Sequence, residues 1–428
     1  EKLVLAEPES DLETYCYDKG DYYALRSNAM IVRVYKDDRK MAMYDVMDET
    51  LVWEEAEAIE LGSNTSHRLV RGDDEYIYGG GMQNGYFSHR DTKIAMKENG
   101  NWDDGGAPNP APFYMTTRGY GVFRNTWAKG EYDFGTTLDI MHKENRFDGY
   151  FFYGPSLKQI LDGYTWVTGR PFLPPVWGLE FGDADCYNKD GQTTSDILEV
   201  AKEYREKDMP GGWMLPNDGY GCGYEDLPEV IGDLHDLGFY TGLWTEDGLD
   251  QIAWEVGEAG SRVCKLDIAW VGPGGEFAFN GSMQATQGLE ENADTRRFIW
   301  TTMGWAGTHR MSVVWTGDNS GNWEYIRMQI PTVIGSGLSA QNYATGDVDG
   351  IFSGSAKTYV RDLQWKVFTP ALMTISGWAS YDKQPWRHGD PYTGYNRDAL
   401  KLKMRLTPYL YTYCNLAHEK GTPVVRGM

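Results

Sequence analysis

The 428-residue chain carries 63 acidic and 40 basic side chains, which gives a formal net charge of −23 and an isoelectric point near 4.7. This charge repels nucleic acid and anionic lipid, and we find no run of eighteen apolar residues that could span a membrane. The length exceeds one ordinary domain, and a hydrophobic content of 41% is enough for large cores.

Residues 1–165 have the pattern of an antiparallel β-sandwich. Short aromatic or β-branched runs alternate there with turns rich in Asp, Gly and Asn. The expected strands lie at residues 29–35, 40–45, 50–55, 76–79, 111–117, 119–125 and 149–154.

From residue 166 the rhythm changes, and after P-F-L-P-P at residues 171–175 strands alternate with helices. The expected strands lie at 176–181, 212–215, 240–244, 263–268, 311–315, 338–343, 371–376 and 423–426, and amphipathic helices at 194–206, 225–237 and 356–368. Eight such alternations predict a (β/α)8 TIM barrel over residues 166–428, with its chemistry at the carboxyl ends of the strands. The chain starts without Met and ends near the eighth expected strand, so we expect truncation at both ends.

Five cysteines are widely spaced and odd in number, with no C-x-x-C pair. This spacing predicts buried thiols and no disulfide framework.

Two runs stand out within the expected barrel: K-L-D-I-A-W at residues 265–270 and W-T-G-D-N at residues 315–319. Each places one Asp at the end of an apolar strand, and we expect the two strands to be successive. Asp267 and Asp318 could then serve as nucleophile and acid in glycoside chemistry. Lys265 should point to the same side of its strand as Asp267, where it would either stabilise the charge of Asp267 or bind a sugar hydroxyl.

Acidic and aromatic residues also follow most of the other expected strands. A single loop acid is most often a helix cap or turn former, but recurrence at consecutive strand ends favours a substrate site. The aromatic content of 14% suits stacking on the C–H faces of sugars, although strand packing explains it equally well. Substrate-binding candidates from these positions are Asp183, Asp218, Trp244, Glu246, Trp270, Asn342, Asp347 and Trp378.

Other chemistries find little support in the sequence. H-E-x-x-H and G-x-S-x-G motifs are absent, and the glycines at residues 219–223 lack dinucleotide spacing. D-V-D-G at residues 347–350 lacks the spacing of a calcium loop. We therefore expect no metal and no cofactor.

Motifs spread over nearly the whole chain resemble glycoside hydrolase family 31. Y-G-G-G-M at 78–82, P-F-Y-M at 112–115 and G-Y-G-V-F at 119–123 are similar to its sandwich signatures, and L-P-P-V-W-G-L at 173–179 to the start of its barrel. The resemblance implies a galactose-mutarotase-like β-sandwich ahead of a (β/α)8 barrel and a retaining α-glycosidase. It makes Asp267 the nucleophile and Asp318 the general acid/base.

The resemblance also suggests further sugar contacts. Arg310 aligns with a sugar-binding Arg of the family and Asp347 with an Asp that follows a strand. Lys265, Trp305 and Trp315 complete the substrate-binding set; for the tryptophans, core packing is the alternative. We expect the sandwich loop at residues 101–104 to reach over the pocket.

Departures from the family pattern bear on the substrate. K-L-D-I-A-W replaces the common W-x-D-M-N-E, and residues 371–378 lack the Arg and His that glucosidases of the family use to contact equatorial hydroxyls. Because a site built to bind a hydroxyl penalises its absence, these losses argue against glucose. The variants look most like the bacterial α-N-acetylgalactosaminidase branch, which implies removal of terminal α-linked N-acetylgalactosamine from glycans and an extracellular or cell-surface location rather than a cytoplasmic one.

Alternatives remain open at this stage. An α-galactosidase, an α-glucosidase or a transglucosylase of the same family would use the same residues. A non-catalytic carbohydrate-binding protein would not need both carboxylates. The expected partner is an oligosaccharide or glycan, with no nucleic acid and no membrane insertion, and the sequence leaves the oligomeric state open.

Overall fold

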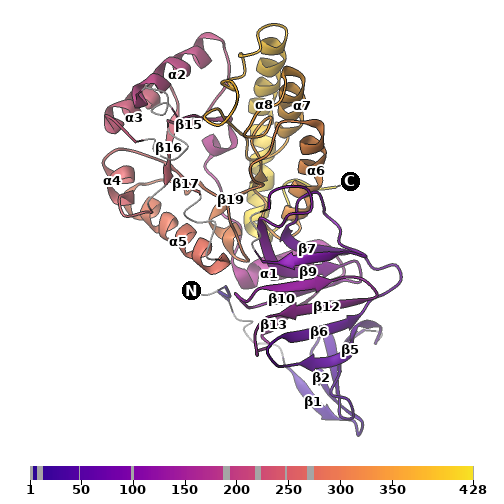
Figure 1. Cartoon of the computed structure of the whole chain (residues 1–428). Coiled ribbons are helices and arrows are strands. Elements are labelled where there is room, and N and C mark those ends of the chain that lie inside the picture. Colours follow the sequence, from indigo (N-terminus) through magenta and orange to yellow (C-terminus); the bar gives the residue numbers. More distant parts are fainter. Residues whose placement is uncertain are drawn as a thin grey trace.

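The computed structural model describes residues 3–6, 13–47, 49–97, 101–186, 193–216, 223–245, 248–267 and 274–427. An all-β part precedes a part in which strands and helices alternate (Figure 1). This order confirms the predicted β-sandwich followed by a barrel.

The N-terminal part consists of two antiparallel sheets that enclose a core around Trp53, Tyr114 and Leu138. One sheet has the order β1-β2-β3-β4-β5-β6-β12-β11-β8 and the other β13-β10-β9-β7. The strands are β1 (Tyr15–Asp18), β2 (Tyr22–Arg26), β3 (Met30–Tyr35), β4 (Met41–Asp45), β5 (Leu51–Glu60), β6 (Thr65–Val70), β7 (Ile77–Met82), β8 (Lys93–Met96), β9 (Asn109–Thr116), β10 (Tyr120–Arg124), β11 (Gly130–Asp133), β12 (Thr137–His142) and β13 (Gly149–Tyr153).

Helix α1 (Leu157–Thr168) connects the two parts, and the Ser156 side chain caps its N-terminus by accepting from the backbone N–H of Gln159. The expected domain boundary between residues 165 and 166 falls inside this helix, and that division stays a prediction.

The C-terminal part is built on an eight-stranded sheet in which every neighbouring pair is parallel. Its strands are β14 (Gly182–Ala184), β15 (Trp213–Leu215), β16 (Tyr240–Thr245), β17 (Val263–Leu266), β18 (Ile299–Thr301), β19 (Ser312–Trp315), β20 (Ala344–Thr345) and β21 (Met373–Ile375). The last strand, β21, pairs with the first, β14, and the Val348 N–H just after β20 donates to the Met373 carbonyl at 2.8 Å. These contacts curl the sheet into the TIM barrel.

Helices cover the outside of the barrel (Figure 1). They are α2 (Ile197–Glu206), α3 (Leu227–Asp236), α4 (Ile252–Gly257), α5 (Gly275–Asn292), α6 (Trp323–Gly337), α7 (Ala356–Lys366) and α8 (Tyr392–Lys420), with the 3₁₀ helices η1 (Val176–Leu179), η3 (Thr194–Asp196) and η5 (Thr308–Arg310).

The order of the barrel strands corrects several expectations. Residues 176–181 begin as η1 and the first strand follows as β14, while β18 was not expected at all. The segment 423–426 is not a strand, because the eighth strand is β21 and helix α8 follows it. Since β18 lies between β17 and β19, the strands that precede Asp267 and Asp318 are not successive.

Strand direction places the candidate chemistry at one end of the barrel. Alternate residues of each strand face the interior, where Trp213, Trp300 and Trp315 share one core cluster. All eight strands run in parallel, so their carboxyl ends meet at one rim, which is where barrels of this kind hold their sites.

The cysteine prediction is correct only in part. Cys264 and Cys414 are buried thiols, but Cys16 is exposed on edge strand β1 and Cys186, just after β14, is disulfide-bonded. Cys222 lies outside the described residues. Wide spacing in the sequence therefore did not exclude a disulfide.

Candidate active site

Strand β17 carries Lys265 and leads directly into Asp267. The parallel register sets Lys265 beside Trp244 of β16 and Trp300 of β18, so it faces the barrel interior. Its ammonium group is buried and lies 2.9 Å from Oδ2 of Asp267. Both side chains therefore project to the same side, as the sequence predicted, and a positive charge stands next to the Asp267 carboxylate.

Strand β19 leads through Thr316 and Gly317 to Asp318. The Nδ2 group of Asn84, in the sandwich, donates to the Thr316 carbonyl at 3.1 Å, and Gln329 of α6 donates to the Thr316 hydroxyl at 2.8 Å. Gly317 has a φ of 109°, a conformation that favours glycine. Hydrogen bonds from the sandwich and from the barrel thus hold the turn that carries Asp318.

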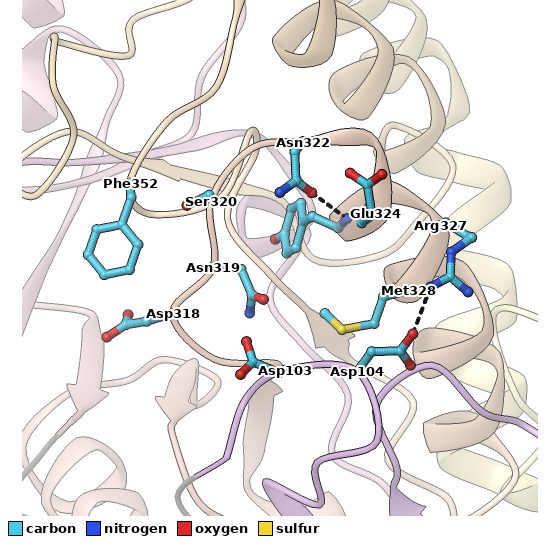
Figure 2. Close-up of a pocket in the computed structure, with 11 residues that line it drawn as sticks. Asp103, Asp104, Asp318, Asn319, Ser320, Asn322, Glu324, Arg327, Met328 and Phe352 are labelled. Atoms are coloured by element: carbon cyan, nitrogen blue, oxygen red, sulfur yellow. Dashed lines mark hydrogen bonds and ion pairs between the residues drawn. The ribbon is translucent and has the colours of Figure 1, made fainter.

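Asp318 lines a cavity of about 400 Å³ between the sandwich and the barrel rim (Figure 2). Asp103 and Asp104 come from the sandwich loop, Asn319 follows Asp318, and Phe352 follows β20. Asp104 also forms an ion pair with Arg327 of α6 at 2.7 Å, drawn as a dashed line in Figure 2. The loop at residues 101–104 therefore lies over the rim, as expected.

Trp102 in the same loop packs against the barrel. Its ring lies 5.5 Å from that of Trp315, centroid to centroid, and its carbonyl accepts hydrogen bonds from Asn84 and Asn319. A Cβ atom on Gly317 would lie 1.9 Å from Cγ of Trp102. The wall beside Asp318 thus depends on the absence of a side chain at position 317.

We predict that Gly317→Ala lowers both stability and activity. The methyl group must displace Trp102 and adopt a strained φ, at a cost of about 1 to 3 kcal/mol in the free energy of unfolding. Denaturant unfolding and kcat/KM on an aryl glycoside measure the two losses. Gly232→Ala is the matched control, because its Cβ in α3 would meet nothing within 4 Å. If Gly317→Ala matches this control in both assays, the close packing of Trp102 on position 317 is not needed for stability or activity.

Asp347 follows β20 and joins the same group. The Trp315 Nε1–H donates to its Oδ2 at 3.2 Å, while its Oδ1 has no hydrogen-bond partner among the described residues. Burial raises the pKa of this carboxyl, an effect opposed by Lys383, Lys265 and Lys366. Contacts therefore run from Asp267 through Lys265 and Trp315 to Asp347, since Lys265 also lies 5.5 Å from the Trp315 ring.

A buried lysine fixes the backbone of Asp347. Lys366 of α7 donates to the Asp347 carbonyl at 2.8 Å and to Oδ2 of Asp362 at 2.8 Å, and Tyr325 of α6 donates to the same carbonyl at 2.7 Å. This network was not expected from the sequence. The sequence did contain a signal for it: Asp362 and Lys366 are four residues apart, a spacing that lets them pair on the helix face that also buries Tyr359.

Two aromatic candidates remain near the rim. Trp244 is buried at the end of β16, and Trp378 follows β21 with 39% of its surface exposed. Their contacts with a sugar stay predictions. Asp218, Glu246 and Trp270 lie outside the described residues.

Three candidates lie away from this group. Arg310 precedes β19, at the amino end of the barrel, and donates to the Thr168 carbonyl at the end of α1. Asn342 precedes β20 and accepts from the backbone N–H of Val424. Trp305 donates from Nε1 to the Thr126 carbonyl and is buried in the core between sandwich and barrel, so it takes the packing role named as the alternative.

Asp183 also points away from the interior. Inward positions of β14 belong to Gly182 and Ala184, and Asp183 instead accepts a hydrogen bond from the Tyr204 hydroxyl of α2. Burial raises the pKa of its carboxyl to about 8. Asp183 therefore lies in the layer between strand and helix, where burial favours the protonated form of its carboxyl.

We predict that Asp183 makes the protein less stable as the pH rises from about 4 to 8. Between its ordinary pKa of 3.8 and the folded value of about 8, the folded state keeps a proton that the unfolded state has lost. Asp183→Asn should reduce the slope of unfolding free energy against pH by up to about 1.4 kcal/mol per pH unit. Denaturant unfolding between pH 5 and 8 measures this slope, with exposed Asp37→Asn as control. An unchanged slope would contradict the assignment.

The described residues contain no group of three or more His, Cys, Asp or Glu side chains able to hold a metal ion. None of the helices in these parts of the chain has the length and apolar character needed to cross a membrane.

Two family models match the chain. The N-terminal galactose mutarotase-like domain of glycosyl hydrolase family 31 matches residues 5–133, and the family's TIM-barrel domain matches residues 275–413. The chain belongs to glycoside hydrolase family 31. Within this family it is similar to α-glucosidase 2 of Bacillus thermoamyloliquefaciens, with 24% identity over 99% of this chain and 66% of the relative. An α-xylosidase of Saccharolobus solfataricus is 23% identical over 74% of this chain and 53% of its own length.

Solved structures of family 31 share the fold. A dextranase of Flavobacterium johnsoniae complexed with glucose has a TM-score of 0.89 at 20% identity, covering 100% of this chain and 65% of that one. An α-xylosidase from a soil metagenome complexed with xylose has a TM-score of 0.85 at 18% identity, covering 100% and 81%. The chain thus spans from about half to two thirds of the length of the two curated relatives described above.

Proposed function

We propose that this chain is the catalytic part of a retaining exo-α-glycosidase, with Asp267 as nucleophile and Asp318 as general acid/base. The observation that carries the proposal is the placement of both carboxylates at the carboxyl rim, after β17 and β19, with β18 alone between them. Two strand spacings separate the backbones by roughly 10 Å. Two Asp side chains that point toward each other across this distance bring their carboxyl groups close to the separation of about 5 to 5.5 Å that a retaining mechanism requires.

The proposed reaction has two steps. Asp267 attacks the anomeric carbon while Asp318 gives its proton to the leaving oxygen, which forms a covalent glycosyl–enzyme intermediate. Asp318 then takes a proton from water, the water attacks the anomeric carbon, and Asp267 leaves as a carboxylate. Lys265, 2.9 Å from Asp267, stabilises that carboxylate before attack and after release.

The remaining residues of the rim would bind the sugar. The Oδ1 atom of buried Asp347 is available to accept from a sugar hydroxyl, since it has no partner among the described residues. Trp378 is half-exposed and suits stacking on a sugar face. The proposed partner is therefore an oligosaccharide or glycan.

For the sugar itself we propose terminal α-linked N-acetylgalactosamine. Residues 371–378 contain neither Arg nor His, so this part of the rim lacks two polar partners for equatorial hydroxyls. Hydrolysis of α-glucosides is the second candidate, because the relatives described above include an α-glucosidase.

A panel of p-nitrophenyl α-glycosides of N-acetylgalactosamine, galactose, glucose and xylose tests the specificity. We expect the highest kcat/KM for the N-acetylgalactosaminide, with the α-anomer of the sugar released first in an NMR time course. Preferential cleavage of the glucoside would contradict the proposed N-acetylgalactosamine specificity and favour α-glucosidase activity. First release of the β-anomer would contradict the retaining mechanism, and a large yield of sugar-acceptor adducts would indicate a transglycosylase.

A further inference from the structure

The tip of the larger sandwich sheet has an unusual side-chain composition on one face. Antiparallel pairing puts alternate residues of β1, β2, β3 and β4 on the same side. Tyrosines and arginines dominate this side: Tyr15, Tyr17, Tyr22, Arg26, Arg33, Tyr35 and Tyr44. We call this surface the tyrosine–arginine face.

The tyrosine–arginine face is hollowed. A cavity of about 370 Å³ opens on it, with Tyr17, Lys19, Tyr22, Arg26, Arg33 and Glu49 among the residues that line it. Small Ala24 lies between these longer side chains in the middle of β2 and leaves the space open. Residues of β1, β2 and β3 line this cavity. Strands β1 and β2 form the end of the molecule farthest from the barrel (Figure 1).

Aromatic rings border the cavity from two strands. Tyr17 is 43% exposed on edge strand β1, and its ring stacks with that of Tyr15 at 6.3 Å and 27°. Tyr22 of β2 lies on the same face, 5.7 Å from the ring of Tyr35. Partly exposed tyrosines of this kind offer a flat apolar surface and a hydroxyl, which suits the C–H faces and hydroxyls of a sugar ring.

The charge of the cavity is opposite to that of the chain. Lys19, Arg26 and Arg33 supply three cations against the single carboxylate of Glu49, although the chain carries a net charge of −23. Only Arg33 is neutralised locally, by Glu49 at 2.9 Å. Arg26 and Lys19 form no ion pair with another described residue. A local positive field in an acidic protein favours an anionic ligand.

The geometry of Arg33 indicates a preformed site. Its guanidinium lies between two rings, 5.1 Å from the centroid of Tyr22 and 4.0 Å from that of Tyr44, and its Nε–H is buried without a hydrogen-bond partner among the described residues. The Tyr35 and Tyr44 hydroxyls are hydrogen-bonded to each other at 3.1 Å. The side chain is therefore positioned before any ligand arrives, which lowers the entropic cost of binding.

We propose that the tyrosine–arginine face binds an acidic saccharide, a pyranose that carries a carboxylate or a sulfate ester. Tyr17 stacks on the sugar ring, and Arg26 and Lys19 pair with the anionic group. This site is separate from the barrel rim and performs no chemistry. It would hold an acidic glycan near the enzyme, and it depends on the proposed function only in that its ligand is also a glycan.

Affinity electrophoresis of the full chain in native gels tests the proposal. Gels containing polygalacturonate supply carboxylates, gels containing dextran sulfate supply sulfate esters, and gels containing neutral dextran supply neither. We expect retardation in one or both acidic gels despite the net negative charge of the protein. Tyr17→Ala and Arg26→Gln should each weaken this binding by about tenfold. The acidic gel with the stronger retardation shows whether the site prefers a carboxylate or a sulfate ester.

Two matched variants serve as controls. Tyr23→Ala removes an equally exposed tyrosine from the opposite face of β2, and Lys93→Gln removes a cation from β8 of the same sheet. Both should bind like the unaltered chain, and hydrolysis of an aryl α-glycoside should be unchanged in all four variants. Absence of retardation in both acidic gels, equal retardation in neutral dextran, or equal loss in Tyr23→Ala would overturn the proposal. None of these outcomes depends on whether the barrel is active.

Discussion

Replacing Asp267 with Ala is expected to lower kcat/KM for an aryl α-glycoside by about 10⁴-fold or more. Without this carboxylate the covalent intermediate cannot form, and the remaining rim residues only bind and polarise the substrate. The measurement is steady-state kinetics with a p-nitrophenyl α-glycoside of the preferred sugar. Wild-type rates in this variant would contradict the assignment of the nucleophile.

Azide gives this prediction a second readout. In Asp267→Ala the ammonium of Lys265 loses the carboxylate at 2.9 Å, so a small anion is attracted to the vacated space. Azide there attacks the anomeric carbon once, with inversion, and Asp318 protonates the leaving phenolate. The expected product is a β-glycosyl azide. Asp267→Asn is the matched variant: it keeps the side-chain volume, should be equally inactive, and should show no rescue because the amide occupies the azide position.

An unfolded variant would also be inactive, so folding needs its own check. Loss of Asp267 removes the carboxylate that lies 2.9 Å from the buried ammonium of Lys265, which costs stability. The double variant Lys265→Met with Asp267→Ala removes both charges. We expect its unfolding free energy to exceed that of Asp267→Ala alone while its activity stays equally low. Recovery of activity together with stability would show that the carboxylate is not the nucleophile.

Much of the architecture could be predicted from local patterns. Alternating aromatic runs predicted the sandwich. The strand expected at residues 263–268 is β17, which ends at Leu266, and the ion pair of Lys265 with Asp267 confirms the predicted orientation of both side chains. Side chains two residues apart on a strand must face the same way, so this inference needed no tertiary knowledge. The loop at residues 101–104 was also expected at the rim, and Trp102 packs there on Trp315.

The errors among the site residues follow from errors of a few residues in strand bounds. Asp183 was taken to follow a strand at 176–181, but it lies inside β14, where alternate residues face opposite sides. Asn342 was placed at the end of a strand at 338–343, yet the strand is β20, so Asn342 precedes it. A residue that precedes a parallel barrel strand belongs to the amino rim, away from the chemistry.

Short strands, and contacts that form only in the folded chain, explain the remaining errors among the site residues. Strand β18 has three residues, I-W-T, which are too few to show alternation. Because β18 was not predicted, Trp305 could not be recognised as part of the segment that connects β18 to β19. Arg310 was assigned by motif similarity alone. Its place just before β19 already implied the amino end of the barrel, where it bonds to the carbonyl of Thr168. Phe352 and Lys366 were missed because their roles depend on loops and helices that meet only in the folded chain.

Replacing Asp318 with Ala is expected to produce a loss that depends on the leaving group. A general acid matters most when the departing oxygen is a poor leaving group, so kcat/KM should fall by about 10²- to 10⁴-fold for a methyl or sugar aglycone. A dinitrophenyl aglycone departs without protonation, and its kcat/KM should change little. The intermediate then accumulates, because no base activates water, and a burst of dinitrophenol should precede a slow steady state.

Asn319→Ala is the matched control, since Asn319 lines the same cavity and donates a hydrogen bond to the Trp102 carbonyl but has no acidic proton to transfer to a leaving group. Its effect should be similar for both aglycones.

The products formed with azide distinguish the roles of the two carboxylates. In Asp318→Ala azide attacks the glycosyl–enzyme intermediate on Asp267, and two inversions yield an α-glycosyl azide. The α-azide from Asp318→Ala and the β-azide from Asp267→Ala together would assign both roles. The reverse pair of products would exchange them, because the configuration records whether the protein carboxylate attacked first.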